Sequence, residues 1–317
     1  MEVIEYEEKH RERWEEFVER SNNGTIFHRM KFLDYHPKGR FQNRHFLIEE
    51  RDRIVSVFPG AEEAAPEGRM LVSHPGASYG GFVVSEDLGV RGSIAVVKRL
   101  FNSLRERGFK KVVLTQPPVI YQKILTNYID FAVWICGGTY LRRELSAVIE
   151  VSEDPLLTFR TAARTAVRKS IKSGVKVRES QDYERFYEIL RKNLRMRHNV
   201  TPTHSLDELL RLTELFPERI RLFCAYLGEE PIGGIVSFIC NQRVVLAFYI
   251  SHIEEYQSYR PVNLLIYELL KWLRQSGHRY LDLGTFTLKM EPDFGLARFK
   301  ENFKARGLFR DTLVIEL

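Results

Sequence analysis

The sequence predicts an α/β protein made of two similar halves, each a mixed, mostly antiparallel sheet flanked by helices. Two observations carry this prediction. The chain has 317 residues, which exceeds the usual size of one domain. The order helix, antiparallel strand pair, long helix, strand is also expected twice along it. The composition, with 44% hydrophobic, 12% aromatic and 28% charged residues, is typical of a globular protein with a sizeable core.

The clearest sign of duplication is a helix that ends in glycine and is followed by an apolar strand. Residues Leu104–Leu114 read Leu-Arg-Glu-Arg-Gly-Phe-Lys-Lys-Val-Val-Leu, and residues Leu273–Leu283 read Leu-Arg-Gln-Ser-Gly-His-Arg-Tyr-Leu-Asp-Leu. Glycine is common just past the end of a helix because it adopts a positive φ without steric cost. We therefore expect Gly108 and Gly277 to end the long helix of each half.

A strand pair precedes each of these helices. Residues Arg44–Phe58 read as strand, charged turn, strand, and residues Leu222–Phe238 read the same way. An amphipathic helix opens each half, at Arg11–Arg20 and at Tyr183–Arg197. The break between the halves is the polar segment Val151–Pro155, so we expect one domain over residues 1–152 and a second over 153–317.

Several classes of protein are disfavoured by the composition. No apolar run reaches the roughly 18 residues that a membrane span needs, and the first residues lack the cationic start and apolar core of a signal peptide. Cys136, Cys224 and Cys240 lie far apart, with neither metal-ligand spacing nor a disulfide framework. We expect a cytoplasmic protein without a transmembrane segment, a metal or a permanently bound cofactor.

The net charge of +6 is unevenly distributed. Residues 153–317 contain 26 Lys and Arg against 21 Asp and Glu, whereas residues 1–152 contain 22 against 21. The second half is therefore the expected place for an anionic ligand. The surplus is too small to indicate nucleic-acid binding by itself.

The order of elements in each half resembles the GNAT fold, in which a mixed sheet splays to admit an acyl donor. The resemblance implies that an amine attacks a thioester or ester carbonyl while backbone groups stabilise the oxyanion. Acetyl-CoA enzymes of this fold bind the pyrophosphate with a Gln/Arg-x-x-Gly-x-Gly/Ala loop at a helix N-terminus. The long helices here open at Gly89–Ser93 and Tyr259–Leu265 without that loop. Its absence counts against an ordinary acetyl-CoA enzyme without excluding one.

Five segments, in order, resemble one family, the FemAB-like transferases that use aminoacyl-tRNA or related acyl donors. They are Leu71–Gly81 with Ser-x-Pro and Tyr-Gly-Gly, the basic Arg160–Val177, Asn193–His198, Tyr280–Gly284 with Asp-Leu-Gly, and Gly295–Phe303 with Gly-Leu-x-x-Phe-Lys-x-x-Phe. The resemblance covers nearly the whole chain. It also suggests that the last strand, Asp311–Leu317, packs back on the first domain.

The chain departs from this family in two places. No long helical hairpin is inserted, as in the compact members. Members that bind muropeptide precursors carry Gln, Trp and Lys near the N-terminus, whereas the matching residues here are His28, Phe32 and His36, with Lys38 nearby. Lys38 is kept as a candidate contact to the acceptor.

The resemblance implies three catalytic candidates. Lys300 would lie near the reacting carbonyl and stabilise anionic charge, Tyr249 would hold the substrate or relay a proton, and Asp282 would accept the proton of the amine. Each has an ordinary alternative: a solvated helix lysine, a core tyrosine, and a carboxylate that caps or pairs with a neighbour.

Further candidates would bind the acceptor. Arg195 and Arg197 would hold an anionic group through the planar guanidinium, or would be exposed helix residues. Tyr79, Gly80 and Gly81 would wall a cleft in the first domain, or would make a tight turn.

The remaining candidates would bind the donor. Arg164, Arg168 and Lys172 recur every four residues, share one helix face and would follow the phosphates of tRNA. A run of charges is usually a solvated face, and this one lacks the interleaved aromatic residues that would stack on bases. The other donor candidates are Arg260, Asn263 and Phe299.

Together these observations predict a transferase that moves an aminoacyl or acyl group from an activated donor, aminoacyl-tRNA or similar, to an amine. The acceptor would be a cell-envelope precursor or another small molecule. One alternative is an acyl-CoA-dependent N-acyltransferase of the same superfamily. A third possibility, from a different class, is a non-catalytic binding protein on a duplicated scaffold.

Overall fold

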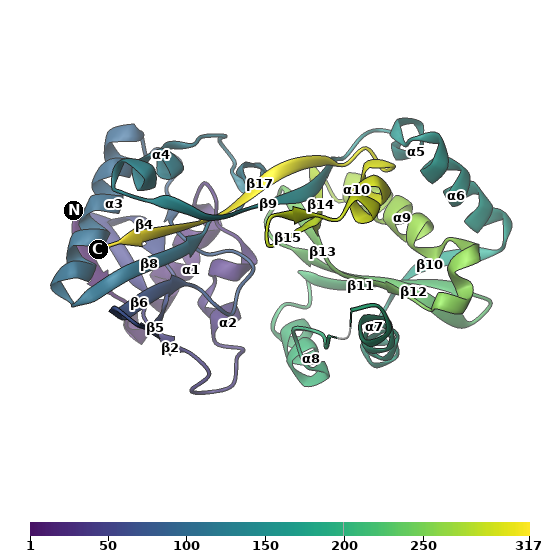
Figure 1. Cartoon of the computed structure of the whole chain (residues 1–317), viewed down its shortest axis with the longest axis horizontal. Coiled ribbons are helices and arrows are strands. Elements are labelled where there is room, and N and C mark those ends of the chain that lie inside the picture. The colour runs from purple at the N-terminus through teal and green to yellow at the C-terminus, as the bar shows by residue number, and fades with distance from the viewer. Residues whose placement is uncertain (199) are drawn as a thin grey trace. The chain divides into compact units, whose positions relative to one another are not determined.

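The computed structural model describes residues 1–198 and 200–317, with the side chains of all of these except Arg197 and His198. The chain divides into two compact units (Figure 1). The first consists of Met1–Glu144 with Phe309–Leu317, and the second of Leu145–Leu308. The sequence placed the division at 152/153, whereas strand β9 (Thr139–Glu150) here contributes residues to both units.

The first unit contains two sheets. Its helices are α1 (Arg11–Arg20), α2 (Met30–Leu33), α3 (Val90–Glu106) and α4 (Tyr128–Ile135). One sheet has the order β1-β3-β4-β7, with β1 (Glu2–Glu5), β3 (Phe46–Glu50), β4 (Arg53–Phe58) and β7 (Val83–Val84). The other has the order β17-β8-β6-β5-β2, with β17 (Arg306–Glu316), β8 (Phe109–Thr115), β6 (Gly68–Ser73), β5 (Ala61–Ala65) and β2 (Gln42–Asn43). Within that sheet β6 and β8 are parallel and the other described pairs are antiparallel.

The second unit contains one main sheet of order β10-β11-β12-β13-β14-β9. Its strands are β10 (Val175–Ser180), β11 (Ile220–Leu227), β12 (Glu230–Ile239), β13 (Val244–His252) and β14 (Tyr280–Thr285), beside the end of β9. A small hairpin follows, β15 (Thr287–Leu288) and β16 (Glu291–Pro292). The helices are α5 (Pro155–Thr158), α6 (Thr161–Lys172), α7 (Tyr183–His198), α8 (Leu206–Leu215), α9 (Pro261–Gln275) and α10 (Phe294–Glu301).

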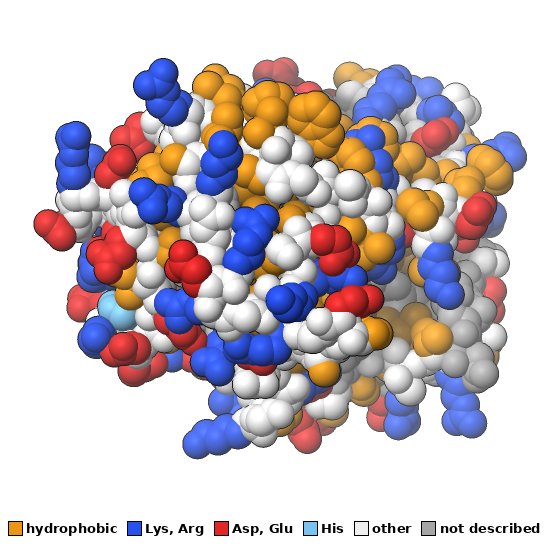
Figure 2. All heavy atoms as spheres, turned by 60° about the vertical axis from the view of Figure 1, so that its left-hand side comes forward, with side chains coloured by type: hydrophobic (Ala, Val, Ile, Leu, Met, Phe, Trp, Pro, Cys, Tyr) orange, Lys and Arg blue, Asp and Glu red, His pale blue; other side chains and the backbone are white. Residues whose placement is uncertain are grey.

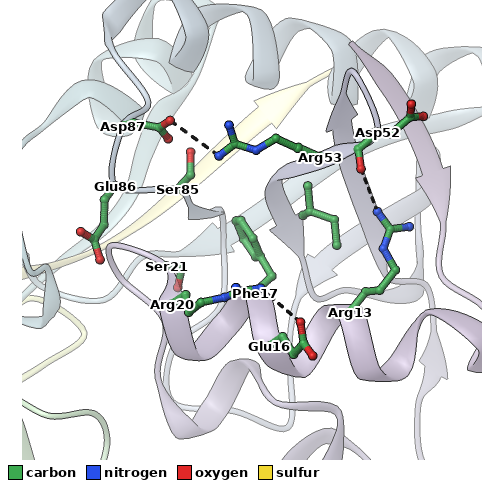
Figure 3. A pocket seen from close by; sticks show the side chains of 11 residues that line it. Arg13, Glu16, Phe17, Arg20, Ser21, Asp52, Arg53, Ser85, Glu86 and Asp87 are labelled. Atoms are coloured by element: carbon green, nitrogen blue, oxygen red, sulfur yellow. Dashed lines mark hydrogen bonds and ion pairs between the residues drawn. The ribbon is translucent and has the colours of Figure 1, made fainter.

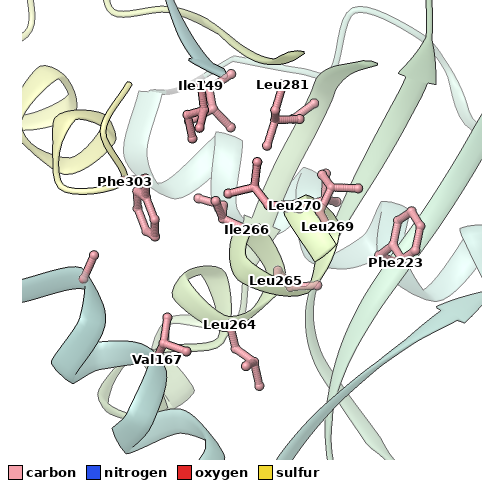
Figure 4. Close-up of a cluster of buried hydrophobic side chains, with 14 of the residues drawn as sticks. Ile149, Val167, Phe223, Leu264, Leu265, Ile266, Leu269, Leu270, Leu281 and Phe303 are labelled. Carbon is pink, nitrogen blue, oxygen red and sulfur yellow. The ribbon is translucent and has the colours of Figure 1, made fainter. Parts of the chain in front are cut away.

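Helix α9 forms the centre of the second unit's core. Its buried side chains recur at helical spacing, from Leu264 to Leu273, and pack against Phe223, Leu281 and Phe303 (Figure 4). Figure 1 shows α6 and α9 on one face of the sheet and α7 and α8 on the other. This burial of both sheet faces explains why β11 to β13 are almost continuously apolar.

The predicted fold class and its repeat are confirmed. Helix α3 leads through Gly108 into β8, and α9 leads through Gly277 into β14. Both glycines have the positive φ that ends a helix, 81° and 78°. The sequence did not predict α4 or the first part of β9, because α4 is apolar on both faces and has no helical alternation of polar residues.

Candidate functional site

The main cavity of the second unit opens where two parallel strands separate. Strands β13 and β14 pair at Val244 with Tyr280, Val245 with Leu281 and Leu246 with Asp282. The described pairing goes no further, although β13 continues to His252 and β14 to Thr285. A register shift between β12 and β13, which leaves Phe248 as the extra residue, adds a bend to β13 at the same level.

A cavity of about 490 Å³ lies at this separation. It is lined by the end of β13, by Leu283 of β14, and by residues of α7, of the start of α9 and of α10. The lining residues are Asn193, Leu194, Ile250, Ser251, His252, Gln257, Arg260, Pro261, Val262, Asn263, Ile266, Leu283, Asp293, Gly295, Leu296, Phe299 and Lys300. Four sequence candidates, Lys300, Phe299, Arg260 and Asn263, therefore meet in one cavity.

The N-terminus of α9 contributes positive charge to one side of the cavity. Pro261 is its first residue, and the missing N–H of proline costs no hydrogen bond there. The preceding residue, Arg260, has a left-handed backbone with φ 60°. No described side chain caps this terminus. The N–H groups of Asn263 and Leu264 donate to the Arg260 carbonyl, so the Val262 N–H and the helix dipole are what this terminus offers an anion, beside the Arg260 and Asn263 side chains.

Lys300 lies in a different environment from a surface lysine. Its side chain is buried, with only 5% of the residue exposed. The ammonium donates three hydrogen bonds to the backbone carbonyls at the end of β14: Leu283 at 2.8 Å, Gly284 at 2.9 Å and Thr285 at 2.8 Å. All three protons of the ammonium are thus engaged, so Lys300 fixes a positive charge at the end of β14 and holds that strand end in place.

Asp282 lies next to this charge but does not line the cavity. Its fully buried carboxylate accepts hydrogen bonds from the Ser146 hydroxyl at 2.6 Å and from the Gly284 N–H at 2.8 Å. Burial lowers the pKa of Lys300 to about 8, and the negative charges of Asp282 and Asp293 act in the opposite direction. The contacts of Asp282 are thus those of a carboxylate that pairs with its neighbours, the ordinary alternative to a proton acceptor.

Tyr249 is held away from the cavity. Its hydroxyl accepts a hydrogen bond from the backbone N–H of His204 at 3.1 Å and lies 2.9 Å from Nδ1 of the same residue. Burial raises the pKa of Tyr249 to about 12, so the hydroxyl stays protonated. The next three residues of β13, Ile250 to His252, line the cavity instead.

Two functional candidates were missed by the sequence analysis. The Ser251 hydroxyl is buried, lines the cavity and has no hydrogen-bond partner among the described residues. His252 lines both this cavity and a neighbouring one, and its Nε2 lies 3.9 Å from a carboxylate oxygen of Glu254. Both directly follow Tyr249, which the sequence analysis had singled out. Strand alternation alone does not reveal where β13 leaves its neighbour.

The neighbouring cavity, of about 740 Å³, is lined by four Lys or Arg side chains and by two acids, Glu188 and Glu254, so we call it the basic cavity. Arg195 lines it together with Arg185, Arg191 and Lys192 of the same helix. The two cavities share Asn193 and His252, so Arg195 lies close to the main cavity without lining it. The side chain of Arg197 lies outside the described residues.

The basic residues of α6 form an exposed stripe. Arg168 and Lys172 are exposed and Arg164 is half-buried, while Ala163 and Val167 on the other side of the helix pack into the core with α9. The stripe does not line the main cavity. It therefore has the geometry of a solvated face that an extended polyanion would be able to follow.

The first-unit candidates form no cleft together. Tyr79 is buried, with its ring 5.7 Å from that of Phe27 and 5.0 Å from that of Tyr121. A Cβ on Gly80 would lie 2.4 Å from a carbonyl oxygen, and one on Gly81, which has φ 76°, would lie 2.2 Å from a side-chain oxygen. Close packing therefore requires glycine at both positions, which fits a tight turn and not the wall of a cleft.

Two cavities of the first unit are described: one with charged walls, and one lined by polar side chains that include Asn23, Gln116 and Asp130. The one in Figure 3, of about 450 Å³, has charged walls whose groups are already paired: Arg20 with Glu16 at 3.1 Å and Arg53 with Asp87 at 3.9 Å. Lys38 is exposed in the turn after α2 and lines none of the described cavities.

Two searches of the described residues bear on cofactors and membranes. No group of three or more His, Cys, Asp or Glu side chains within them is placed to hold a metal ion. No helix in this part of the chain has the length and apolarity needed to cross a bilayer.

Comparison with known proteins agrees with this geometry. Residues 158–301, which include every residue lining the main cavity, match the family model of the acetyltransferase (GNAT) domain. No curated protein matches the sequence. Among solved structures, the chain is similar to FemX, with a TM-score of 0.76 and 12% identity over 100% of this chain and 98% of that one.

Two further structures share the fold over nearly the whole chain. One is a tandem GNAT protein from the clavulanic acid biosynthesis pathway, with a TM-score of 0.57 and 10% identity over 99% of this chain and 98% of that one. The other is the C-terminal domain of a putative lysylphosphatidylglycerol synthetase from Agrobacterium fabrum, with a TM-score of 0.59 and 10% identity over 96% and 91%. Residues 158–301 thus match a GNAT acetyltransferase domain, and the chain has the tandem GNAT fold that its motifs predicted; both findings support an N-acyltransferase.

Proposed function

We propose that the protein transfers an aminoacyl group from aminoacyl-tRNA to an amine, and that the reaction takes place in the cavity between β13 and β14. One observation supports this most directly: the separated strand ends, the α9 N-terminus and the buried Lys300 ammonium surround the same cavity. In the reaction the amine nitrogen attacks the ester carbonyl. The new C–N bond forms, the C–O bond to the ribose breaks, and the amine's proton is finally carried by the ribose hydroxyl.

Charge stabilisation would supply most of the rate. The tetrahedral intermediate carries an oxyanion, and N–H groups on the free part of β13 are suited to bind it. Lys300 would add a fixed positive charge beside them without donating a hydrogen bond to the substrate, because three carbonyls already occupy its protons. His252, which lines the cavity, would accept the amine's proton through its imidazole.

The donor is proposed from the positive groups around the cavity. A phosphate near the reacting ester would lie at the α9 N-terminus with Arg260 and Asn263. The exposed stripe of Arg164, Arg168 and Lys172 would contact more distant phosphates of the tRNA. The absence of a glycine-rich loop before Pro261 favours this donor over acyl-CoA.

The acceptor is proposed as the amine of a small, anionic molecule, such as a cell-envelope precursor. The basic cavity that contains Arg195 adjoins the main cavity through His252 and would hold the anionic group. The free amine would then extend past His252 towards the donor's carbonyl. Arg197, whose side chain lies outside the described residues, remains a further candidate for this contact.

A second candidate donor is acyl-CoA. It is favoured by the family model, which describes an acetyltransferase domain, and by the tandem GNAT neighbour, a structure described as being without AcCoA. The pyrophosphate of CoA would use the same α9 N-terminus. The two donors differ in the α6 stripe, which a CoA molecule in the cavity has no need to contact.

Thermal-shift measurements with CoA, acetyl-CoA and charged tRNA, at low and moderate salt, separate the donors. We expect charged tRNA to raise the Tm and salt to weaken this effect, because a ligand of the folded state stabilises it and phosphate contacts are screened. The variant Arg168→Glu/Lys172→Glu should lose most of the stabilisation. Lys110→Glu/Arg211→Glu, an equal charge change at exposed sites on β8 and α8, serves as the control. If only CoA species raised the Tm, and Arg168→Glu/Lys172→Glu did not change this effect, the proposed donor would be acyl-CoA and not aminoacyl-tRNA.

A further inference from the structure

Helix α4 of the first unit is apolar on both of its faces. Ile129, Ala132 and Val133 face the core and pack with residues of α3. The opposite face exposes Tyr128, Phe131, Trp134 and Ile135, and Trp134 is 60% exposed. A helix that is apolar all round is normally buried or in contact with a membrane, so this exposed face needs a partner.

The apolar surface extends beyond the helix. Eight of the eighteen exposed large hydrophobic side chains in the described part of the chain fall within residues 124–141, whereas single exposed apolar residues are normally scattered. They are Ile124, Leu125, Tyr128, Phe131, Trp134, Ile135, Tyr140 and Leu141. Figure 2, which brings the side of the first unit forward, shows hydrophobic side chains gathered at the upper edge of this face, with Lys and Arg side chains among them. We call residues 124–141 the α4 surface.

Most charges around the α4 surface are positive, and the acids beside it, Glu86 and Asp311, form ion pairs with Lys123 and Arg143. Arg91, Lys98 and Arg105 are exposed on α3 at intervals of seven residues and so share one face of the helix that packs against α4. Lys98 and Arg105 lie close enough to act electrostatically on Cys136, the residue directly after α4. Exposed Arg142 follows at the other end.

Acidic groups are nearly absent from the same surface. Between residues 124 and 142 the sequence has one acid, Asp130. That carboxyl is largely removed from solvent, and burial, with the nearby charge of Asp311, raises its pKa to about 6. The exposed side of the α4 surface is therefore apolar and aromatic with a cationic border.

We propose that the α4 surface binds an anionic lipid bilayer, with α4 lying in the plane of the interface. Trp and Tyr are the side chains enriched at the level of the lipid headgroups, and Phe, Ile and Leu insert their apolar ends below it. Arg91, Lys98, Arg105 and Arg142 would face the anionic headgroups. A second copy of the chain is a poorer occupant, because two cationic borders would face each other.

Vesicle binding by the full chain tests this proposal. Vesicles of phosphatidylcholine alone and of a mixture containing one quarter phosphatidylglycerol are sedimented with the protein. We expect co-sedimentation with the anionic vesicles, at least tenfold more than with the neutral ones, and a decrease with salt. Trp14 is fully buried and Trp272 half-buried, so a blue shift of tryptophan emission on binding would report mainly Trp134. Absence of binding to either vesicle overturns the proposal.

Two variants and a control make the test specific. Phe131→Ser/Trp134→Ser should reduce vesicle binding at least tenfold, and Lys98→Glu/Arg105→Glu should remove the preference for anionic lipid, both without lowering the Tm. Leu157→Ser, an exposed apolar residue on α5, should leave binding unchanged. Equal binding by Phe131→Ser/Trp134→Ser and the parent, or a concentration-dependent dimer in size-exclusion chromatography that this variant abolishes, would overturn the lipid assignment; the dimer would give the surface to a second copy.

Discussion

The two units repeat one arrangement, a glycine-capped helix leading into a strand that has a parallel neighbour, but they treat that strand pair differently. In the second unit β13 and β14 pair over three residues and then separate around a cavity. In the first unit β6 and β8 pair from Arg69 with Phe109 to Ser73 with Leu114, which includes every residue of β6 except the first, Gly68.

Beyond this point the first unit closes the gap. The Ser73 hydroxyl accepts hydrogen bonds from the N–H groups of Gly81 at 2.9 Å and Thr115 at 3.3 Å, and the Gly80 N–H donates to the carbonyl of Thr115 at 2.9 Å. The Tyr-Gly-Gly segment thus fills, in the first unit, the position that corresponds to the cavity of the second unit. In this chain a cavity thus lies where the second unit's strands separate, whereas a loop fills the matching place in the first unit.

The strongest test of this difference is Lys300→Met. We expect kcat to fall on the order of 100-fold or more, because the fixed charge beside the reacting carbonyl is lost. The free energy of unfolding should also fall, by about 2–3 kcal/mol, since three carbonyls of β14 lose their donor. Steady-state transfer assays and urea unfolding measure the two effects. Unchanged turnover in a folded variant would remove Lys300 from the reaction.

The matching change in the closed unit is Gly81→Ala. A Cβ would lie 2.2 Å from the Gln116 side-chain oxygen, and the φ of 76° disfavours any L-residue. We expect a loss of about 2–4 kcal/mol in the free energy of unfolding, with kcat per folded molecule unchanged. A variant that stays stable but loses turnover would place the Tyr-Gly-Gly segment in the active site and break the contrast between the units.

The pH dependence of stability sharpens the same contrast. The pKa of Lys300 is about 8 in the folded chain and about 10.5 in an unfolded one. Between these values the unfolded chain holds a proton that the folded chain has lost, so stability contributed by this group rises with pH. Urea unfolding of the parent relative to Lys300→Met should show this gain from about pH 8 to 10.5, while kcat of the parent falls as the ammonium is lost. A difference that shrinks with pH would contradict the lowered pKa.

The smallest effect is expected from two serines in corresponding places. Ser251→Ala should raise KM about 3- to 10-fold without loss of stability, because the described residues offer its buried hydroxyl no hydrogen bond and a ligand would do so. Ser73→Ala should instead lower the free energy of unfolding by about 1–2 kcal/mol and leave KM unchanged, because its hydroxyl accepts two N–H groups. If Ser73→Ala raised KM and Ser251→Ala lowered stability, the ligand would bind in the first unit and not in the second.

Much of the fold was predictable because it depends on local signals. Gly108 and Gly277 mark helix ends by their need for positive φ, and the α1 boundaries, Arg11 to Arg20, follow from spacing alone. Helix α4 was not predictable, because its exposed face carries Phe131 and Trp134 where solvent would normally favour polar residues.

The site was only partly predictable, because it depends on long-range geometry. The motif pointed to Lys300, but its three carbonyl partners come from a strand fifteen to seventeen residues earlier in the chain. Ser251 carries no motif at all. Its significance arises because β13 leaves β14 a few residues earlier, and no pattern of residue types in one strand records the path of its neighbour.

At Arg260 the chain keeps a cavity-lining guanidinium at the cost of an unfavourable backbone conformation. It adopts φ 60° at the entrance to α9, a conformation that costs a residue with a side chain roughly 1–2 kcal/mol and costs glycine almost nothing. Glycine at this position would therefore make the protein more robust while removing the guanidinium from the cavity. The entrance to α9 is a place where selection for thermostability and selection for transfer should choose different residues.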